Sequence, residues 1–176
     1  MSGSKRIALT GFMGVGKSSV ARHLANLSGS RRVDLDSYIE ASEGRPIARI
    51  LDSDGEPAYR RIETAALAKL LANEPAPILS LGGGTWTIER NRELLREYGY
   101  TALWLEASFE HCWLNIAFSR KTRPLARDRD SAERLFNERQ KTYCLAEWHF
   151  VVRPELTSFE IARQIREEFF DHDGQN

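Results

Sequence analysis

A glycine-rich stretch near the start of the chain has the residue types and spacing of a phosphate-binding loop. Residues 11–18 read Gly-Phe-Met-Gly-Val-Gly-Lys-Ser, which fits the pattern G-x-x-x-x-G-K-[ST]. In such a loop, backbone N–H groups turn toward phosphate oxygens, a lysine reaches the terminal phosphates and a hydroxyl ligates Mg²⁺. The alternative is an ordinary glycine-rich turn, but a strand-like segment precedes the motif and a helical pattern follows it. The predicted nucleotide-binding residues are Gly14, Val15, Gly16, Lys17, Ser18 and Ser19, with Lys17 also catalytic and Ser18 also a metal ligand.

Two carboxylates follow the next strand-like segment. Asp34 and Asp36 are two positions apart, so they project to the same side if the strand continues that far. One carboxylate would then support a metal ion while the other accepts a proton from a hydroxyl group. A solvated turn is the alternative for an isolated Asp-x-Asp, but the position after a phosphate loop favours a site. The Asn-Lys-x-Asp motif with which GTPases read guanine does not occur in the sequence.

An arginine and a glycine triplet are candidates for binding a second substrate. Arg60 and Glu63 are three positions apart in a helical pattern, which places them on one face of the helix. Glu63 would hold the guanidinium so that it grips a carboxylate with two hydrogen bonds; a plain surface ion pair is the alternative. Gly82, Gly83 and Gly84 follow a strand-like segment and allow close approach of a ligand to the backbone. A glycine triplet alone does not identify a binding site.

The elements that must position these residues alternate along the chain. Short apolar runs predict strands over residues 7–10, 32–35, 78–81, 102–105 and 150–152, and segments of helical period lie between them. Ser108 and Ser131 are predicted to cap two of the helices, and residues 119–130 are polar and contain Pro124, which predicts a loop. This alternation predicts an α/β fold, a doubly wound domain that spans residues 1–176.

Composition and charge exclude several classes of protein. Among the 176 residues, 25 Lys and Arg balance 25 Asp and Glu, so the chain lacks the overall positive surplus that is usual in nucleic-acid binders. No window approaches the ~20 apolar residues of a membrane span. Cys112 and Cys144 are the only cysteines, too few for a disulfide framework or a four-cysteine zinc site. No signal peptide is recognisable, so we expect a cytoplasmic protein without a nucleic-acid or membrane partner.

In their order and spacing, the motifs resemble those of shikimate kinases. The resemblance rests on the phosphate loop, Asp34-x-Asp36, the segment 55–63, the glycine triplet and Arg123-Pro124-Leu125, and it covers residues 7–152. It implies a five-stranded parallel sheet flanked by helices, of the P-loop kinase type, with a mobile lid at about 119–130 and an acceptor-binding helical region at about 36–63. The implied reaction transfers the γ-phosphoryl group of ATP, with Mg²⁺, to the 3-hydroxyl of shikimate, a step in the biosynthesis of aromatic amino-acid precursors.

The resemblance also implies roles for single residues. Asp36 would contact the accepting hydroxyl, and Asp34 would be the outer carboxylate of the metal site. Arg60 and Arg139 would clamp the shikimate carboxylate, and Gly83, flanked by Gly82 and Gly84, would touch the ring. Arg123 would be the lid arginine that moves onto the nucleotide and the transferring phosphoryl group, as a catalytic residue.

The sequence departs from the family pattern at three places. Leu114-Asn115 replaces an arginine that stacks on adenine, which leaves Arg153 as a candidate for nucleotide binding. Residues 139–143 keep the arginine-to-tyrosine spacing of the family but lack its Pro-Leu, and Trp86 has no assigned role. Two other functions remain open: a related kinase for another small hydroxy acid such as gluconate, and a catalytically inactive nucleotide-binding module. We expect a monomer.

Overall fold

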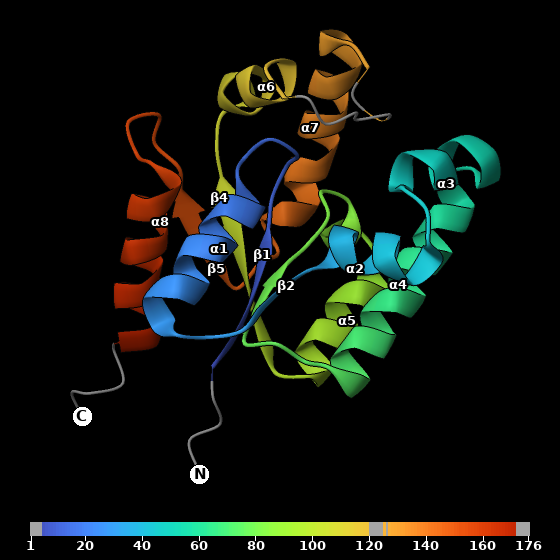
Figure 1. The fold of residues 1–176 in the computed structure, drawn as a ribbon. Coiled ribbons are helices and arrows are strands. Elements are labelled where there is room, and N and C mark those ends of the chain that lie inside the picture. Colours follow the sequence, from blue (N-terminus) through green and yellow to red (C-terminus); the bar gives the residue numbers. More distant parts are fainter. Residues whose placement is uncertain (1–4, 120–124, 126, 172–176) are drawn as a thin grey trace.

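A five-stranded parallel sheet forms the centre of the computed structural model, which describes residues 5–119, 125 and 127–171 (Figure 1). The strands lie in the order β2-β3-β1-β4-β5, and all four neighbouring pairs are parallel. They are β1 (Arg6–Thr10), β2 (Arg32–Asp34), β3 (Ile78–Ser80), β4 (Tyr100–Glu106) and β5 (Trp148–Val151). The predicted doubly wound sheet and its five strands are therefore confirmed.

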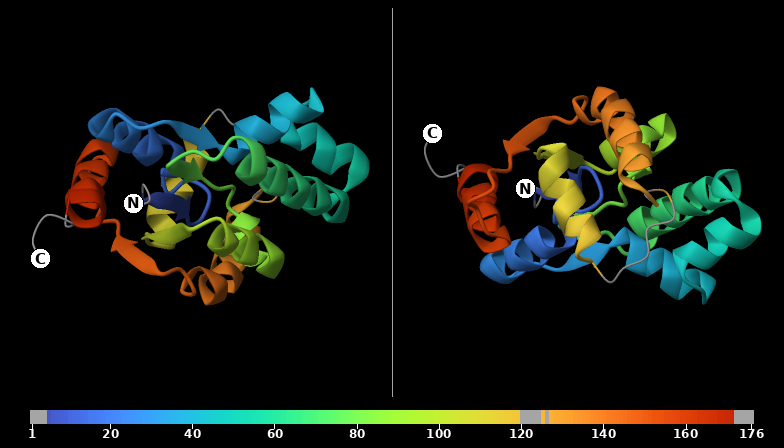
Figure 2. Two further views of the ribbon diagram at one scale, coloured as in Figure 1. Left: turned by 90° about the horizontal axis from the view of Figure 1, so that it is seen from below. Right: turned by 90° about the horizontal axis from the view of Figure 1, so that it is seen from above.

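Helices cover both faces of this sheet, as a parallel sheet with crossover connections requires. Helices α1 and α8 lie side by side on one face, and α4 and α5 lie on the other (Figures 1 and 2). The helices are α1 (Lys17–Ser28), α2 (Leu35–Glu43), α3 (Ile47–Asp54), α4 (Glu56–Asn73), α5 (Glu89–Glu97), α6 (Phe109–Ala117), α7 (Arg129–Tyr143) and α8 (Ser158–Ile165), with a 3-10 turn η1 (Thr85–Thr87) and a π-helical turn η2 (Arg166–Phe170).

The central strand β1 is buried on both faces, which explains its continuous apolar sequence. Ile7, Ala8 and Leu9 are fully buried, so both pleat directions contribute to the core. The strand order reverses at β1, since β2 and β3 lie on one side of it and β4 and β5 on the other. In open parallel sheets, ligands bind outside the carboxyl ends of the strands at this reversal point. The phosphate loop follows β1 directly and therefore lies at that position.

Of the two predicted helix caps, one is confirmed and one is wrong. The Ser108 hydroxyl accepts a hydrogen bond from the backbone N–H of His111 and caps α6, as predicted. Helix α7, in contrast, is capped by Asp128, whose carboxylate accepts from the backbone N–H of Ser131 at 2.9 Å. Ser131 thus lies inside the first turn of the helix that it was predicted to cap, because the aspartate three residues earlier captures its N–H.

The segment after β2 also differs from the prediction. The strand ends at Asp34, and α2 begins at Leu35, so Asp36 belongs to a first helical turn and not to a strand. The alternation of strand side chains consequently does not explain why Asp34 and Asp36 face the same region. Helix α3, which the sequence pattern did not predict, follows after Pro46.

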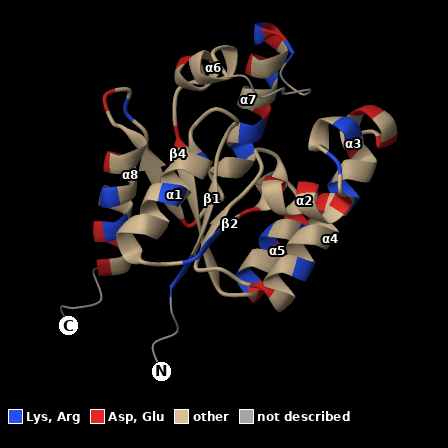
Figure 3. Ribbon diagram, in the orientation of Figure 1, with Lys and Arg blue, Asp and Glu red and all other residues tan. Residues whose placement is uncertain are grey.

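The surface carries mixed charge. Acidic and basic residues occur together on α3, α5 and α8 (Figure 3). In the part of the chain that the structure describes, no helix is long and apolar enough to cross a membrane.

Candidate active site

The phosphate-binding sequence lines a cavity of about 600 Å³ at the carboxyl end of β1. The six phosphate-loop residues among those predicted to bind the nucleotide, Gly14 to Ser19, lie on its wall. The Lys17 ammonium donates hydrogen bonds to the carbonyl oxygens of Gly11 and Phe12, at 2.7 and 3.0 Å. These bonds hold the lysine across the loop. The loop leads into the N-terminus of α1, where backbone N–H groups and the helix dipole favour phosphate.

Gly14 is required by the close approach of α6 to the loop. Its φ is +83°, and a Cβ atom there would lie 2.5 Å from the carbonyl oxygen of Cys112. Any side chain would push α6 away from the loop. The side chain of Asn115, also on α6, donates from Nδ2 to the Gly14 carbonyl oxygen at 2.8 Å, so helix and loop are joined at this point.

Side-chain oxygens of Ser18, Asp34 and Ser80 lie together at the phosphate loop. The Ser18 hydroxyl donates to Asp34 Oδ2 at 2.6 Å and lies 3.5 Å from the hydroxyl of Ser80. The second Asp34 oxygen accepts from the backbone N–H of Ser37 and caps α2. Among the described residues no group of three or more His, Cys, Asp or Glu could hold a metal. Hydroxyl and carboxylate oxygens, completed by substrate phosphates and water, nevertheless fit Mg²⁺, which rarely uses an all-protein cage.

The sequence did not lead us to Ser80 as a residue of this group, although its place at the end of a predicted strand was a signal. The parallel register of β2 and β3 pairs Asp34 with Ser80, so the last residues of the two strands lie next to each other. A serine at the end of the strand next to the phosphate loop places its hydroxyl beside Ser18 and Asp34. Only the strand order shows that β3 is the neighbour of both β1 and β2.

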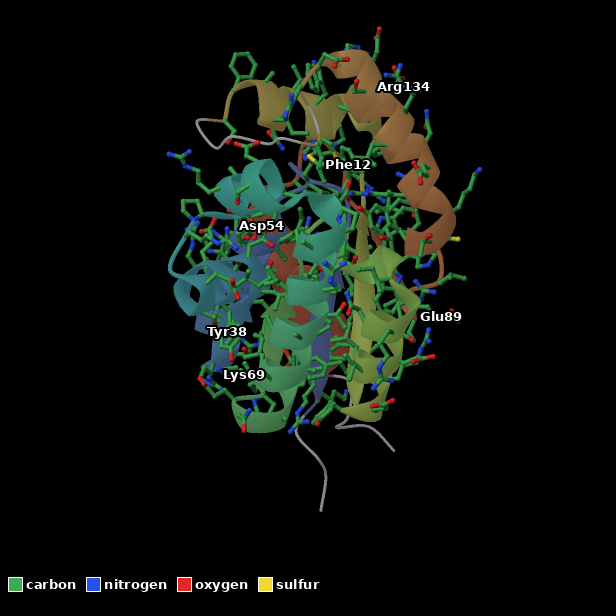
Figure 4. All side chains as sticks on the ribbon, turned by 90° about the vertical axis from the view of Figure 1, so that its right-hand side faces the viewer. Phe12, Tyr38, Asp54, Lys69, Glu89 and Arg134 are labelled. Atoms are coloured by element: carbon green, nitrogen blue, oxygen red, sulfur yellow. The ribbon has the colours of Figure 1, made fainter. Side chains whose placement is uncertain are left out.

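A second cavity, of about 280 Å³, lies between α2, α3, α4 and α7. Its wall includes all six residues predicted to bind the acceptor: Asp36, Arg60, Gly82, Gly83, Gly84 and Arg139. Figure 4 views the molecule from this side, with α4 and α5 in front of the sheet and α3 and α7 above them. The structure thus brings together residues that are up to 103 positions apart in the sequence.

The two cavities share four wall residues, namely Met13, Asp36, Gly82 and Gly83. Asp36 is the only carboxylate among them. A group at this position can reach a molecule in either cavity, which is the geometry that a proton acceptor between a phosphate donor and a hydroxyl acceptor needs.

A buried carboxylate holds Arg60 at the acceptor cavity. Arg60 Nη1 donates to Glu63 Oε2 at 2.9 Å, and its Nη2 donates to Glu56 at 3.0 Å. Glu63 is fully buried, so this is not a surface ion pair. Burial opposes the charged form of Arg60, but the charge of Glu63 and the hydrogen bonds to Glu63 and Glu56 raise the pKa of the guanidinium. Arg60 therefore remains a cation on the cavity wall.

Gly84 gives the Arg60 guanidinium its space. A Cβ atom at Gly84 would lie 2.7 Å from Arg60 Cζ, so a side chain here would displace the guanidinium. The next residue, Thr85, donates from its hydroxyl to Glu63 Oε1 at 2.6 Å. Gly84 and Thr85 therefore contact Arg60 and Glu63 respectively, so the end of the glycine triplet packs directly against the Arg60–Glu63 ion pair.

Arg139 is the second cation of this cavity. It comes from α7 and is buried, with an exposed fraction of only 6%. Two guanidinium groups from different helices thus face a cavity that also exposes glycine backbone. Such a cavity suits a small anion with hydroxyl groups.

Comparison with known proteins agrees with the motifs. The sequence pattern that defines the family described as "Shikimate kinase" matches residues 13–170. The chain belongs to the shikimate kinase family. These enzymes are ATP-dependent kinases that transfer phosphate to shikimate.

Individual relatives are similar over most of their length. The shikimate kinase of Caulobacter vibrioides strain NA1000 is 41% identical over 150 residues, which cover 83% of this chain and 73% of that protein. The shikimate kinase of Helicobacter hepaticus is 35% identical over 164 residues, covering 93% and 95% of the two chains. The structure of the shikimate kinase from Acinetobacter baumannii in complex with shikimate superposes with a TM-score of 0.88, at 29% identity, and covers 97% and 96% of the two chains.

A gluconokinase from Sinorhizobium meliloti has the same fold at a greater distance. Its TM-score is 0.56 at 19% sequence identity, over 92% of this chain and 89% of that one. This likeness concerns the fold alone.

The structure does not place the two other residues predicted to bind the nucleotide, Arg123 and Arg153, on the wall of its cavity. Arg123 lies outside the described residues, as do most of residues 119–126 of the expected lid. Arg153 does not line the nucleotide cavity; it lies at a separate cavity with His149 and Glu168, so the geometry does not support its assignment to the nucleotide. The wall of the nucleotide cavity also includes Leu156, Ser158 and Ile161. The sequence gives no sign of this, because these residues lie before or within the terminal helix α8 and belong to no phosphate-binding motif.

Proposed function

We propose that the chain transfers the γ-phosphoryl group of ATP to the 3-hydroxyl of shikimate. The observation that carries the proposal is the position of Asp36 on the shared wall of two cavities, one lined by the phosphate loop and the other by Arg60 and Arg139. Shikimate has a carboxylate and ring hydroxyls, which match the two guanidinium groups and the carboxylate of Asp36 on the wall of one cavity. The family membership of the chain supports the same substrate.

The proposed roles follow from this arrangement. Arg60 and Arg139 bind the acceptor carboxylate, and the backbone of Gly82, Gly83 and Gly84 lies against the ring. Asp36 accepts the proton of the acceptor hydroxyl while the oxygen of that hydroxyl bonds to the γ-phosphorus. The bond between the γ-phosphorus and the β,γ-bridging oxygen breaks, and ADP leaves. Lys17 stabilises the charge on the phosphates once it exchanges the Gly11 and Phe12 carbonyls for phosphate oxygens.

Ser18 and Asp34 would hold Mg²⁺ in this proposal, and Ser80 adds a third oxygen beside them. When bound, the ion neutralises charge on the β- and γ-phosphates. The role of Arg123 as a charge-stabilising group from the lid is also part of the proposal and rests on its motif alone.

A panel of acceptors tests the proposed function. ADP release is measured with ATP and Mg²⁺ in the presence of shikimate, gluconate or nucleoside monophosphates. We expect the highest kcat/KM with shikimate and phosphorylation of its 3-hydroxyl in the product. Preference for gluconate would assign the chain to the other small-acid kinases, and ATP binding without turnover on any acceptor would assign it to the inactive modules. We further propose a cytoplasmic monomer, which light scattering of the purified protein and cell fractionation test.

A further inference from the structure

Tyr143 lies behind the acceptor cavity and contacts two groups on its wall. The phenol is fully buried at the C-terminal end of α7. Its hydroxyl donates a hydrogen bond to the carbonyl oxygen of Gly83, 60 residues away in the sequence. One turn earlier on the same helix, Arg139 lies close enough to the Tyr143 hydroxyl for its charge to lower the pKa of the phenol. A Cβ atom at Gly83 would lie 3.3 Å from Arg139 Nη1, so the guanidinium also borders Gly83. The phenol thus lies beside both a guanidinium and a glycine of the cavity wall.

The protonation state of Tyr143 fits its hydrogen bond to Gly83. Burial raises the pKa of Tyr143 to about 12, and the charge of Arg139 limits that rise. The phenol consequently keeps its proton at neutral pH and donates it to the Gly83 carbonyl, while its oxygen faces the positive charge of Arg139.

A second long-range hydrogen bond joins the same two segments. Trp86, just after the glycine triplet, is fully buried and donates from Nε1 to the carbonyl oxygen of Thr142 at 3.0 Å. Trp86 donates from the glycine segment to α7, and Tyr143 donates from α7 to the glycine segment, so two hydrogen bonds join these segments. The Trp86 bond runs from the indole to a backbone carbonyl and involves no residue of the cavity wall, whereas the Tyr143 bond ends on Gly83, which lines the cavity.

We propose that Tyr143 is a positioning residue for acceptor binding, which fixes the Arg139 guanidinium relative to the Gly83 carbonyl. This inference rests on the proposed function, because it assumes that Arg139 binds the acceptor. Loss of the hydroxyl leaves the Gly83 carbonyl without this donor and removes the polar oxygen beside the Arg139 guanidinium. Arg139 then samples several orientations, and the acceptor must order it on binding.

Tyr143→Phe tests the proposal, with Tyr100→Phe as the matched control. Tyr100 is also a buried tyrosine whose hydroxyl donates to a backbone carbonyl, that of Ala76 at 2.6 Å, but it lies at the opposite end of β4 from the cavities. We expect Tyr143→Phe to raise the acceptor KM roughly tenfold, as for one lost hydrogen bond, with the KM for ATP unchanged. Both variants should lower Tm, whereas Tyr100→Phe should leave the acceptor KM unchanged.

A double-mutant cycle with Arg139→Ala shows through which group Tyr143 acts. If it positions Arg139, Tyr143→Phe weakens acceptor binding much less in the Arg139→Ala background than in the wild type. Binding is followed by calorimetric titration of the folded protein where turnover is too slow. Equal acceptor KM values for Tyr143→Phe and Tyr100→Phe, or fully additive effects in the cycle, would overturn the proposal. A wild type that prefers another hydroxy acid overturns the proposed function instead, and the same comparison is then made with that acid.

Discussion

Arg60 donates a hydrogen bond over 2.9 Å to the fully buried carboxylate of Glu63, three residues along α4. A buried carboxylate is stable only when its oxygens are paired, and Thr85 and Arg60 each pair one of them. The guanidinium is thereby held against Gly84 at the acceptor cavity. This relationship makes Arg60 the most direct test of the acceptor site.

Arg60→Ala should weaken use of the acceptor and leave nucleotide binding little changed. Removal of one partner of a buried charge pair costs about 2–5 kcal/mol, so we expect the acceptor kcat/KM to fall by roughly 30-fold or more. Steady-state kinetics with shikimate, and ATP binding by titration, measure the two effects. Arg90→Ala is the control, since Arg90 pairs with Glu93 and Glu97 on the exposed face of α5. Equal losses in both variants would argue against a specific role for Arg60.

Asp36→Asn should lower kcat by orders of magnitude while ATP still binds. The amide retains the shape of the side chain but cannot accept the hydroxyl proton. Single-turnover measurements separate this chemical defect from a defect in binding. A kcat near that of the wild type would remove Asp36 from the role of proton acceptor.

Asp34→Asn should instead raise the Mg²⁺ concentration needed for half-maximal activity. Asp34 Oδ2 lies 2.6 Å from the Ser18 hydroxyl, whereas its other oxygen caps α2, so the substitution affects both metal affinity and helix stability. Ser37→Ala removes the hydroxyl that donates to the capping oxygen and serves as the control for the cap. Identical Mg²⁺ titrations for Asp34→Asn and the wild type would contradict a metal role.

Lys17→Ala should abolish detectable phosphoryl transfer without unfolding the protein. The Lys17 ammonium donates hydrogen bonds to the loop carbonyls of Gly11 and Phe12, and apolar core packing does not depend on its charge. Circular dichroism should therefore show the wild-type spectrum. Normal turnover by a folded Lys17→Ala protein would refute the assignment of the phosphate loop.

The Arg45–Asp54 pair predicts an acid-sensitive contribution to stability. The hydrogen bond from Arg45, together with one from Ser53, lowers the pKa of Asp54 to about 2. The unfolded chain, with an ordinary aspartate pKa near ~3.9, binds the proton first as pH falls. The contribution is therefore fully present above pH ~4 and is lost between ~4 and 2. The Tm difference between the wild type and Asp54→Asn should shrink over that range, with Asp52→Asn in the same helix as the control; a constant difference would contradict the prediction.

The sequence by itself determined the elements of this protein that depend on neighbouring residues. Glycines, a lysine and a serine at fixed spacing between a strand and a helix specify the phosphate loop, because backbone conformation there depends on local residue type. Continuous apolar runs specified β1, β3 and β4, since strands buried on both faces must be apolar. Arg60 and Glu63 shared a face because helical periodicity alone puts them there.

Tertiary structure decided every relationship between segments far apart in the chain. The pairing of Asp34 with Ser80 depends on strand order and register, and the contact of Tyr143 with Gly83 depends on how α7 packs against the sheet. Asp36 reaches both cavities from the first turn of α2, a turn that begins because Asp34 captures the Ser37 N–H in place of continuing the strand. Strand order, register and the start of α2 depend on competition among packing arrangements of the whole chain. Residue type and spacing within one segment do not contain that information.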